Sequence, residues 1–217
     1  MIYLTSDLHG GQDLNGLEQF LSVRKSEDWL FVLGDLELRF RDTEENKKFS
    51  DFFEALQCNI AFIDGNHENF DYLYSLPEED WNGGRIHRVS DRIVHLMRGH
   101  IFNIEGKSFL TMGGCTSSQR WKDWNLWWPQ EEPSAEEIKS AYKTLEKHFN
   151  RVDYVLTHKY HREGISPDPN ADPFTLVGFM NFIDANVDFK HWYSGHWHKT
   201  KLFDSKHTVV YNKLIHI

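Results

Sequence analysis

Short apolar segments that are followed by carboxylate, amide or imidazole side chains constrain the fold of this chain more than any other feature of its sequence. Such segments recur five times, at residues 1–6, 29–33, 59–63, 153–157 and 192–194. Apolar runs of this length, bounded by glycine and polar residues, indicate buried β-strands. Between the first three, residues 14–24 and 44–57 carry apolar side chains at helical spacing. Strands that alternate with amphipathic helices are typical of βαβ units, so this part of the chain predicts an α/β fold.

The rest of the chain adds further predicted elements. Four short strand-like runs, broken by turn-forming residues, predict an antiparallel meander at 86–89, 92–97, 100–104 and 108–112. Ser134 and Glu137 form a capping box, which predicts a helix from there to about residue 149. A further helix is expected at 176–185, and a final hairpin at 199–204 and 208–212. Because no repeat, low-complexity tract or linker interrupts these elements, we expect one domain over residues 1–217.

The composition argues against several classes of protein. The chain has 24 Lys and Arg against 33 Asp and Glu, a formal net charge of −9, which disfavours binding of long nucleic acids through a broad basic face. Two cysteines, Cys58 and Cys115, are too few for a disulfide framework. No run reaches the roughly 18 apolar residues of a transmembrane helix, and the first residues lack the pattern of a secretory signal. We therefore expect a cytoplasmic protein with no membrane partner; the sequence leaves its oligomeric state open.

Each of the five predicted strands is followed by side chains that bind divalent metals. They are Asp7 and His9, Asp35, Asn66 and His67, His158, and His196 and His198. Carboxylate, amide and imidazole groups are ligands of Zn, Mn and Fe. In open α/β sheets ligands bind at the carboxyl ends of the strands, so these side chains are expected to converge on one rim. The spacing of two in Asp7/His9 and in His196/His198 would point both members of each pair the same way in an extended segment.

Taken together, these motifs resemble those of a known enzyme family. Any one of them is weak evidence for a metal site, but the ordered set is specific. Asp7-Leu-His9, Gly34-Asp35, Gly65-Asn66-His67-Glu68, Thr157-His158 and Gly195-His196-Trp197-His198 resemble the motif series of calcineurin-like metallophosphoesterases over residues 7–198. The resemblance implies a four-layer αββα sandwich, in which two mixed sheets pack together and are flanked by helices.

The resemblance also implies a ligand set and a chemistry. Asp7, His9 and His198 would hold one divalent metal, Asn66, His158 and His196 a second, and Asp35 would bridge them; Mn, Fe, Zn and Ni are the candidates. Such a pair favours in-line attack at phosphorus by a metal-bridging hydroxide, so the expected enzyme is a hydrolase of a phosphate monoester or small phosphodiester. In the family, the histidine that matches His67 binds phosphate and helps the leaving group depart, which makes His67 the candidate general acid.

The match has departures that bear on the substrate. Leu38 stands where the protein-phosphatase branch has the aspartate that orients its catalytic histidine, and strand alternation would place Glu37 on the wrong face to replace it. Arg39 is retained and is a candidate substrate-binding residue. A second is Arg120, beside Trp121 and after Gly113-Gly114, while Trp124, Trp127 and Trp128 are expected to pack the following helix onto the domain. His161 and Arg162 are weaker candidates for the cleft.

Three alternatives stay open. The chain could instead be a nucleotide phosphodiesterase or pyrophosphohydrolase, or a serine/threonine-type protein phosphatase, although Leu38 disfavours the protein phosphatase. A non-enzymatic scaffold on the same fold is expected to lack ligands, and here all seven ligand positions are filled. The expected partner is therefore a small phosphorylated substrate or a nucleotide.

Overall fold

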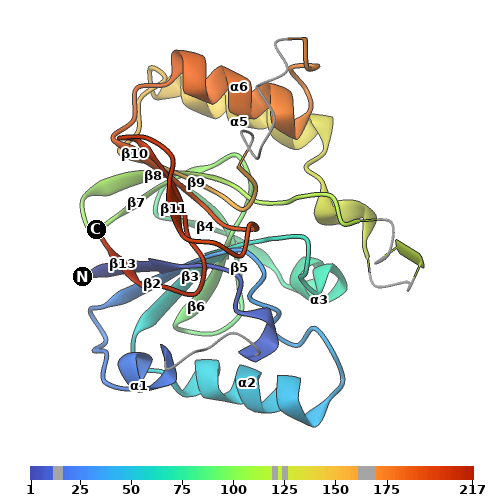
Figure 1. Ribbon diagram of the computed structural model, residues 1–217, viewed down its shortest axis with the longest axis vertical. Coiled ribbons are helices and arrows are strands. Elements are labelled where there is room, and N and C mark those ends of the chain that lie inside the picture. Colours follow the sequence, from blue (N-terminus) through green and yellow to red (C-terminus); the bar gives the residue numbers. More distant parts are fainter. Residues whose placement is uncertain (12–16, 119–121, 124–126, 161–169) are drawn as a thin grey trace.

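Two mixed β-sheets lie face to face in a computed structural model of the chain, and helices cover their outer faces (Figure 1). The structure describes residues 1–11, 17–118, 122–123, 127–160 and 170–217. Helices α1 (Leu17–Leu21) and α2 (Glu44–Ala55) lie outside the first sheet, and α5 (Ala135–Lys147) and α6 (Leu176–Asn186) outside the second. The four-layer αββα arrangement predicted from the sequence is confirmed.

The first sheet has seven strands in the order β13-β1-β2-β3-β6-β5-β4. Their bounds are β1 Ile2–Thr5, β2 Trp29–Leu33, β3 Asn59–Ile63, β4 Glu78–Trp81, β5 Gly84–Arg88, β6 Ile93–Leu96 and β13 Ile215–His216. Strands β1, β2, β3 and β6 pair in parallel, and the others add antiparallel edges. The carboxyl ends of β1, β2 and β3 therefore lie at the same edge of the sheet.

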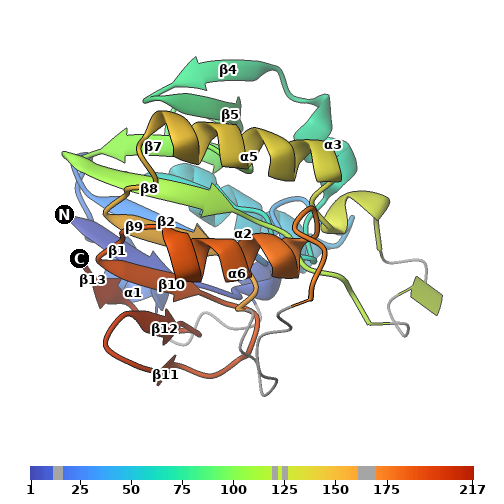
Figure 2. The same ribbon diagram turned by 90° about the horizontal axis from the view of Figure 1, so that it is seen from above.

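The second sheet has six strands in the order β11-β12-β10-β9-β8-β7. Their bounds are β7 Ile101–Ile104, β8 Lys107–Met112, β9 Tyr154–Thr157, β10 His191–Ser194, β11 Lys201–Leu202 and β12 His207–Val209. The four central strands pair in parallel, and β11 and β7 are antiparallel edges. Helices α5 and α6 run alongside each other over this sheet (Figure 2), with Tyr142 of α5 edge-on to Phe179 of α6.

Strand β2 shows why its sequence is apolar throughout. Leu30 and Val32 face outward and pack in one core with Phe53 of α2, whereas Phe31 lies between the sheets against Phe109 of β8, with ring centroids 5.0 Å apart. Successive strand residues point to opposite faces, so a strand covered on both sides must be apolar at every position. Burial of each such side chain contributes about 1.5–3 kcal/mol to folding. A third core lies between the second sheet and α5 and α6.

The predicted meander is correct in two of its pairings and wrong in the third: β5 with β6 and β7 with β8 are antiparallel as expected, but β6 and β7 do not pair. Strands β5 and β6 belong to the first sheet, whereas β7 and β8 belong to the second. The chain passes from one sheet to the other between β6 and β7 through Gly99, where a Cβ would lie 2.9 Å from the Cβ of Ala141 on α5 and where φ is +75°. The second and fourth strands of the expected meander each have a further, parallel partner that is remote in sequence, β3 for β6 and β9 for β8.

The other predicted elements agree with the structure apart from their ends. The Ser134–Glu137 capping box opens α5, and β11 and β12 form the final hairpin. The sequence analysis missed α3 (Phe70–Ser75), β4 and β13, and two short 3₁₀ turns, η1 (His9–Gly11) and η2 (Pro129–Glu131). Among the described residues, no helix combines the length and apolar character that a membrane span requires.

Candidate metal centre

Sharp turns follow the strands that carry the candidate ligands. Asp7, Asp35 and His196 have φ values of 59°, 53° and 71°, in the left-handed region. Glycines allow these turns to approach one another: a Cβ on Gly65 would lie 2.0 Å from Asp35 Oδ1, and one on Gly195 would lie 1.9 Å from Ser6 Oγ. The candidate ligands do converge at one rim, but the expectation that extended-strand alternation aligns the paired residues is wrong, because the chain has left the strand by Asp7.

One group of possible ligand atoms comes from both sheets. Asp7 and His9 follow β1 of the first sheet, and His198 follows β10 of the second; their ligand atoms all lie within 4.8 Å of one another. His9 Nε2 is 2.9 Å from His198 Nε2, which is 3.5 Å from Asp7 Oδ1. The Asp7 carboxylate is fully buried, whereas the side chain of His198 is 49% exposed. Burial raises the pKa of Asp7.

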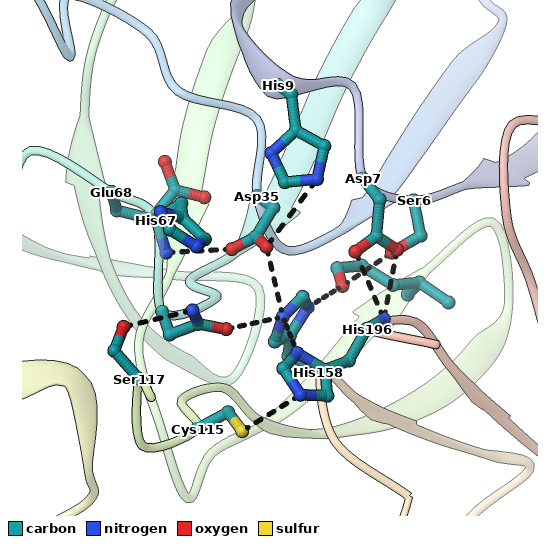
Figure 3. A network of polar contacts seen from close by, with 12 residues as sticks. Ser6, Asp7, His9, Asp35, His67, Glu68, Cys115, Ser117, His158 and His196 are labelled. Carbon is teal, nitrogen blue, oxygen red and sulfur yellow. Dashed lines mark hydrogen bonds and ion pairs between the residues drawn. The ribbon is translucent and has the colours of Figure 1, made fainter. Parts of the chain in front are cut away.

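A second group lies beside the first and is more deeply buried. Asp35, His158 and His196 lie side by side (Figure 3), and their ligand atoms are within 4.8 Å of one another. Asn66 Oδ1 is 3.3 Å from His158 Nε2. His196 Nδ1 is 3.2 Å from the same nitrogen. Asn66 donates from Nδ2 to Ser117 Oγ at 3.1 Å, which turns its amide oxygen toward the histidines. The second group thus presents amide, carboxylate and imidazole donors together.

Asp35 lies between the two groups. Its Oδ2 is 3.4 Å from His158 Nε2 and 3.9 Å from His9 Nε2, and its Oδ1 accepts the backbone N–H of His67 at 2.8 Å. Complete burial is the largest influence and would raise the pKa of this carboxyl, but the neighbouring imidazoles of His158, His67 and His9 outweigh it and hold the pKa below its usual range. The carboxylate therefore stays ionised between the two sets of donors.

The hydrogen bonds around His158 test whether these residues fit a metal. Its Nδ1 is 2.8 Å from the carbonyl oxygen of Leu33. A carbonyl can only accept, so Nδ1 carries a proton and Nε2 is the nitrogen that faces Asp35 and Asn66. Burial lowers the pKa of His158, but the carboxylates of Asp35 and Asp7 outweigh it and raise the pKa to about 10, so Nε2 is a position that a proton or a cation can occupy. Imidazole nitrogen with carboxylate and amide oxygens is a donor set that suits borderline divalent cations, so the residues present fit such a metal.

His67 lines the same cavity without belonging to either group. Its ring is buried and lies edge-on to that of His9, with centroids 5.7 Å apart. Burial lowers the pKa of His67 to about 4. The following residue, Glu68, is buried and accepts the backbone N–H groups of Leu36 and Glu37 with its two carboxylate oxygens at 3.0 and 3.1 Å. Glu68 thereby ties the loop after β3 to the loop after β2.

The cavity at this rim has a volume of about 520 Å³. Besides candidate metal ligands and His67, it is lined by Glu37, Arg41, Thr116 and Ser118. The sequence analysis missed Arg41, Thr116 and Ser118 as lining residues. Thr116 and Ser118 follow Gly113-Gly114, which the sequence analysis linked to the site, whereas nothing in the sequence pattern marks Arg41.

The structure does not bring Arg39 to this cavity. Its guanidinium is 2.5 Å from Glu54 of α2 and lies over the ring of Tyr72. The side chain of Glu37 turns to His9 and not to His67, with Oε1 2.9 Å from Nδ1. Glu37 therefore does not replace the missing aspartate, as expected, although its φ of 59° and not strand alternation sets its direction.

The tryptophan-rich segment is only partly within the described residues. Arg120, Trp121, Trp124, His161 and Arg162 lie outside them. Trp128 contacts Phe40 and Phe70 and donates to Asp71 at 3.0 Å. Because Phe70 and Asp71 belong to α3, the expectation that Trp128 packs the following helix, α5, is wrong in the choice of helix.

Comparisons with known proteins give a family and a fold for this chain. The family model described as calcineurin-like phosphoesterase matches residues 1–200. Among solved structures, TT1561 of Thermus thermophilus is 14% identical with a TM-score of 0.51, and the match covers 97% of this chain and 87% of that one. A protein of unknown function from Aquifex aeolicus, AQ665, is 19% identical with a TM-score of 0.40 and 87% coverage of both chains. No curated protein matches the chain.

The family match spans nearly the whole chain and includes every strand end that contributes a candidate ligand. The likeness to the Thermus protein concerns the fold alone, and it is the same αββα arrangement that positions those strand ends. The chain belongs to the calcineurin-like phosphoesterase family.

Proposed function

We propose that the chain is a dinuclear metal-dependent phosphoesterase that hydrolyses a phosphate monoester or a small phosphodiester. The observation that carries the proposal is the pair of adjacent ligand groups, in which Asp35 Oδ2 of the second group lies 3.4 Å from His158 Nε2 and 3.9 Å from His9 Nε2 of the first group. Asp7, His9 and His198 would hold one cation and Asn66, His158 and His196 the other, with Asp35 between them. Mn, Fe, Zn and Ni all suit these oxygen and nitrogen donors. When bound, the two cations would supply a nucleophile at neutral pH and neutralise charge on the phosphoryl oxygens.

His67 is placed to handle the leaving group. Burial lowers the pKa of the ring to about 4, which favours neutral imidazole. A bound phosphate brings negative charge beside the ring, which favours the imidazolium form. With its pKa raised by the bound phosphate, His67 would take up a proton from solvent and donate it to the departing oxygen. The backbone N–H of His67 on Asp35 Oδ1 fixes the loop that carries this ring beside the ligand groups.

The size and charge of the cavity favour a small substrate. A volume of about 520 Å³ lies within the range of small-molecule sites. Arg41 is the only lysine or arginine among the described lining residues, and Thr116 and Ser118 add hydroxyl groups. A guanidinium and two hydroxyls suit the oxygens of a second phosphate or of a sugar. A small phosphorylated compound or a nucleotide is thus the proposed substrate, and the cytoplasm its proposed location.

A substrate panel tests this function. Metal-free protein is supplied in turn with Mn, Fe, Zn, Ni and Mg and assayed on p-nitrophenyl phosphate, bis-p-nitrophenyl phosphate, a cyclic nucleotide and a dinucleoside polyphosphate. We expect hydrolysis that needs two equivalents of metal, and its loss in Asp35→Asn. Preference for the diester or the dinucleotide would favour the phosphodiesterase or pyrophosphohydrolase alternative. A chain that binds two metals yet hydrolyses none of these compounds would contradict the proposal.

A further inference from the structure

We propose that Glu37 is a positioning residue for His9 and that it strengthens the metal site formed by Asp7, His9 and His198. This inference rests on the proposed dinuclear function. It concerns a side chain that the motif comparison left without a role, because the family position known to orient a histidine is occupied here by the buried Leu38.

The contact between Glu37 and His9 fixes which ring nitrogen is free. Glu37 Oε1 is 2.9 Å from His9 Nδ1, and the two side chains are only 7% and 14% exposed. An ionised carboxylate can only accept, so Nδ1 donates to it and Nε2 is the ring nitrogen that remains for a metal. Nε2 faces the ligand group, because it lies 2.9 Å from His198 Nε2 and 3.9 Å from Asp35 Oδ2. Carboxylates that bind the remote nitrogen of a ligating histidine orient the ring and make it a stronger donor.

The turn that carries Glu37 is itself held in place. The backbone N–H of Glu37 donates to Glu68 Oε2 at 3.1 Å, and its carbonyl oxygen accepts from Asn46 Nδ2 at 2.8 Å. On the other side, a Cβ on Gly10 would lie 2.6 Å from Asn46 Nδ2 and 3.4 Å from Glu37 Oε2. The loop after β1 thus fits against the loop after β2 only with glycine at this position. The carboxylate of Glu37 is therefore aimed by contacts on both sides of it.

The two proposed metal sites differ in how their histidines are oriented. In the second group, His158 is held by the backbone carbonyl of Leu33, and its side chain is fully buried. In the first group, His9 depends on the side chain of Glu37, and its neighbour His198 is 49% exposed. Loss of Glu37 should therefore weaken the first site while the second keeps its support.

A manganese titration of the metal-free full-length chain tests this difference. Mn²⁺ is added to the wild type, Glu37→Ala, Glu37→Gln and the control Glu54→Gln, and electron paramagnetic resonance separates isolated from spin-coupled ions. Glu54 is a matched control because it is a glutamate paired with Arg39 away from the cavity. In both Glu37 variants we expect the first Mn²⁺ to bind within about threefold of wild type and the second roughly 10–100-fold more weakly. The coupled signal should then appear only at higher Mn²⁺, and Glu54→Gln should match wild type.

Each other outcome has a definite meaning. Equal weakening of both sites, or no weakening in either Glu37 variant, would overturn the role of Glu37 while leaving the dinuclear function standing. Glu37→Gln keeps the size of the side chain, so it reports on charge even where Glu37→Ala fails to fold. A wild-type chain that binds a single Mn²⁺ would overturn the proposed function and this inference together.

Discussion

His67 is the residue at which catalysis and metal binding can be separated. It lines the cavity but belongs to neither ligand group. We expect His67→Ala to keep two metal ions and to lower kcat by about 10²–10⁴-fold, because a general acid in the transition state contributes that much. Metal content by mass spectrometry and kcat on the preferred substrate check this. If His67→Ala instead lost a metal ion, His67 would have to be a ligand and its assignment as the acid would be wrong.

Arg41 and Arg39 make a matched pair two positions apart. Only Arg41 lines the cavity, whereas Arg39 is paired with Glu54. We expect Arg41→Ala to raise KM about tenfold or more, since a hydrogen bond to a charged group contributes about 1.5–3 kcal/mol. Arg39→Ala should leave both kcat and KM unchanged within twofold. The reverse pattern in steady-state kinetics would return the substrate role to Arg39.

At the scale of the elements, a buried polar network joins β3, β5 and β6. Asp64, at the end of β3, accepts from the guanidinium of Arg98 and lies 3.1 Å from His95 Nε2. His95 Nδ1 is in turn 3.0 Å from His87 Nδ1. Burial, and after it the neighbouring His95, lowers the pKa of His87 to about 4. His87 is therefore held neutral within the sheet.

This network predicts how stability depends on pH. The folded-state pKa of His87 lies below the unfolded value of about 6.5, so its contribution is complete above pH 6.5 and is lost as the pH falls toward 4. Thermal unfolding of the metal-free chain should thus show a Tm that decreases across this window. His87→Gln should flatten the decrease. An equal slope in the variant would show that other groups control it.

The same elements show what the sequence can and cannot predict. β2 was predicted with its correct ends because its apolar run and the Gly34-Asp35 that ends it are local signals. The parallel pairing of β6 with β3 was not predicted, because β3 is remote in sequence and a short apolar run does not indicate which sheet it joins. At the site, the convergence of the candidate ligands was predicted from residue type at strand ends. The contact of Glu37 with His9 was not predicted, because the left-handed φ of Glu37 sets a direction that strand alternation does not describe.

At the scale of the whole molecule, the candidate metal centre lies across the boundary between the two sheets. Asp7, His9, Asp35 and Asn66 follow strands of the first sheet, and His158, His196 and His198 follow strands of the second. Direct contacts already cross this boundary, since the backbone N–H of His196 donates to Asp7 Oδ2 at 2.9 Å and His158 Nδ1 donates to the carbonyl of Leu33. Each proposed ligand set draws on both sheets, so each bound cation would tie one sheet to the other.

Metal binding should therefore stabilise the entire fold. At a free metal concentration of 100 Kd, one site that forms only in the folded chain adds about 2.7 kcal/mol, which corresponds to roughly 5–10 °C in Tm for a domain of this size. Scanning calorimetry before and after chelation measures the change, and Asp35→Asn should show much less of it because it weakens both sites. Hydrogen exchange should place the gain in the loops after β1 and β10, which face each other across the sheets. Protection confined to one sheet would mean that the cations do not bridge them.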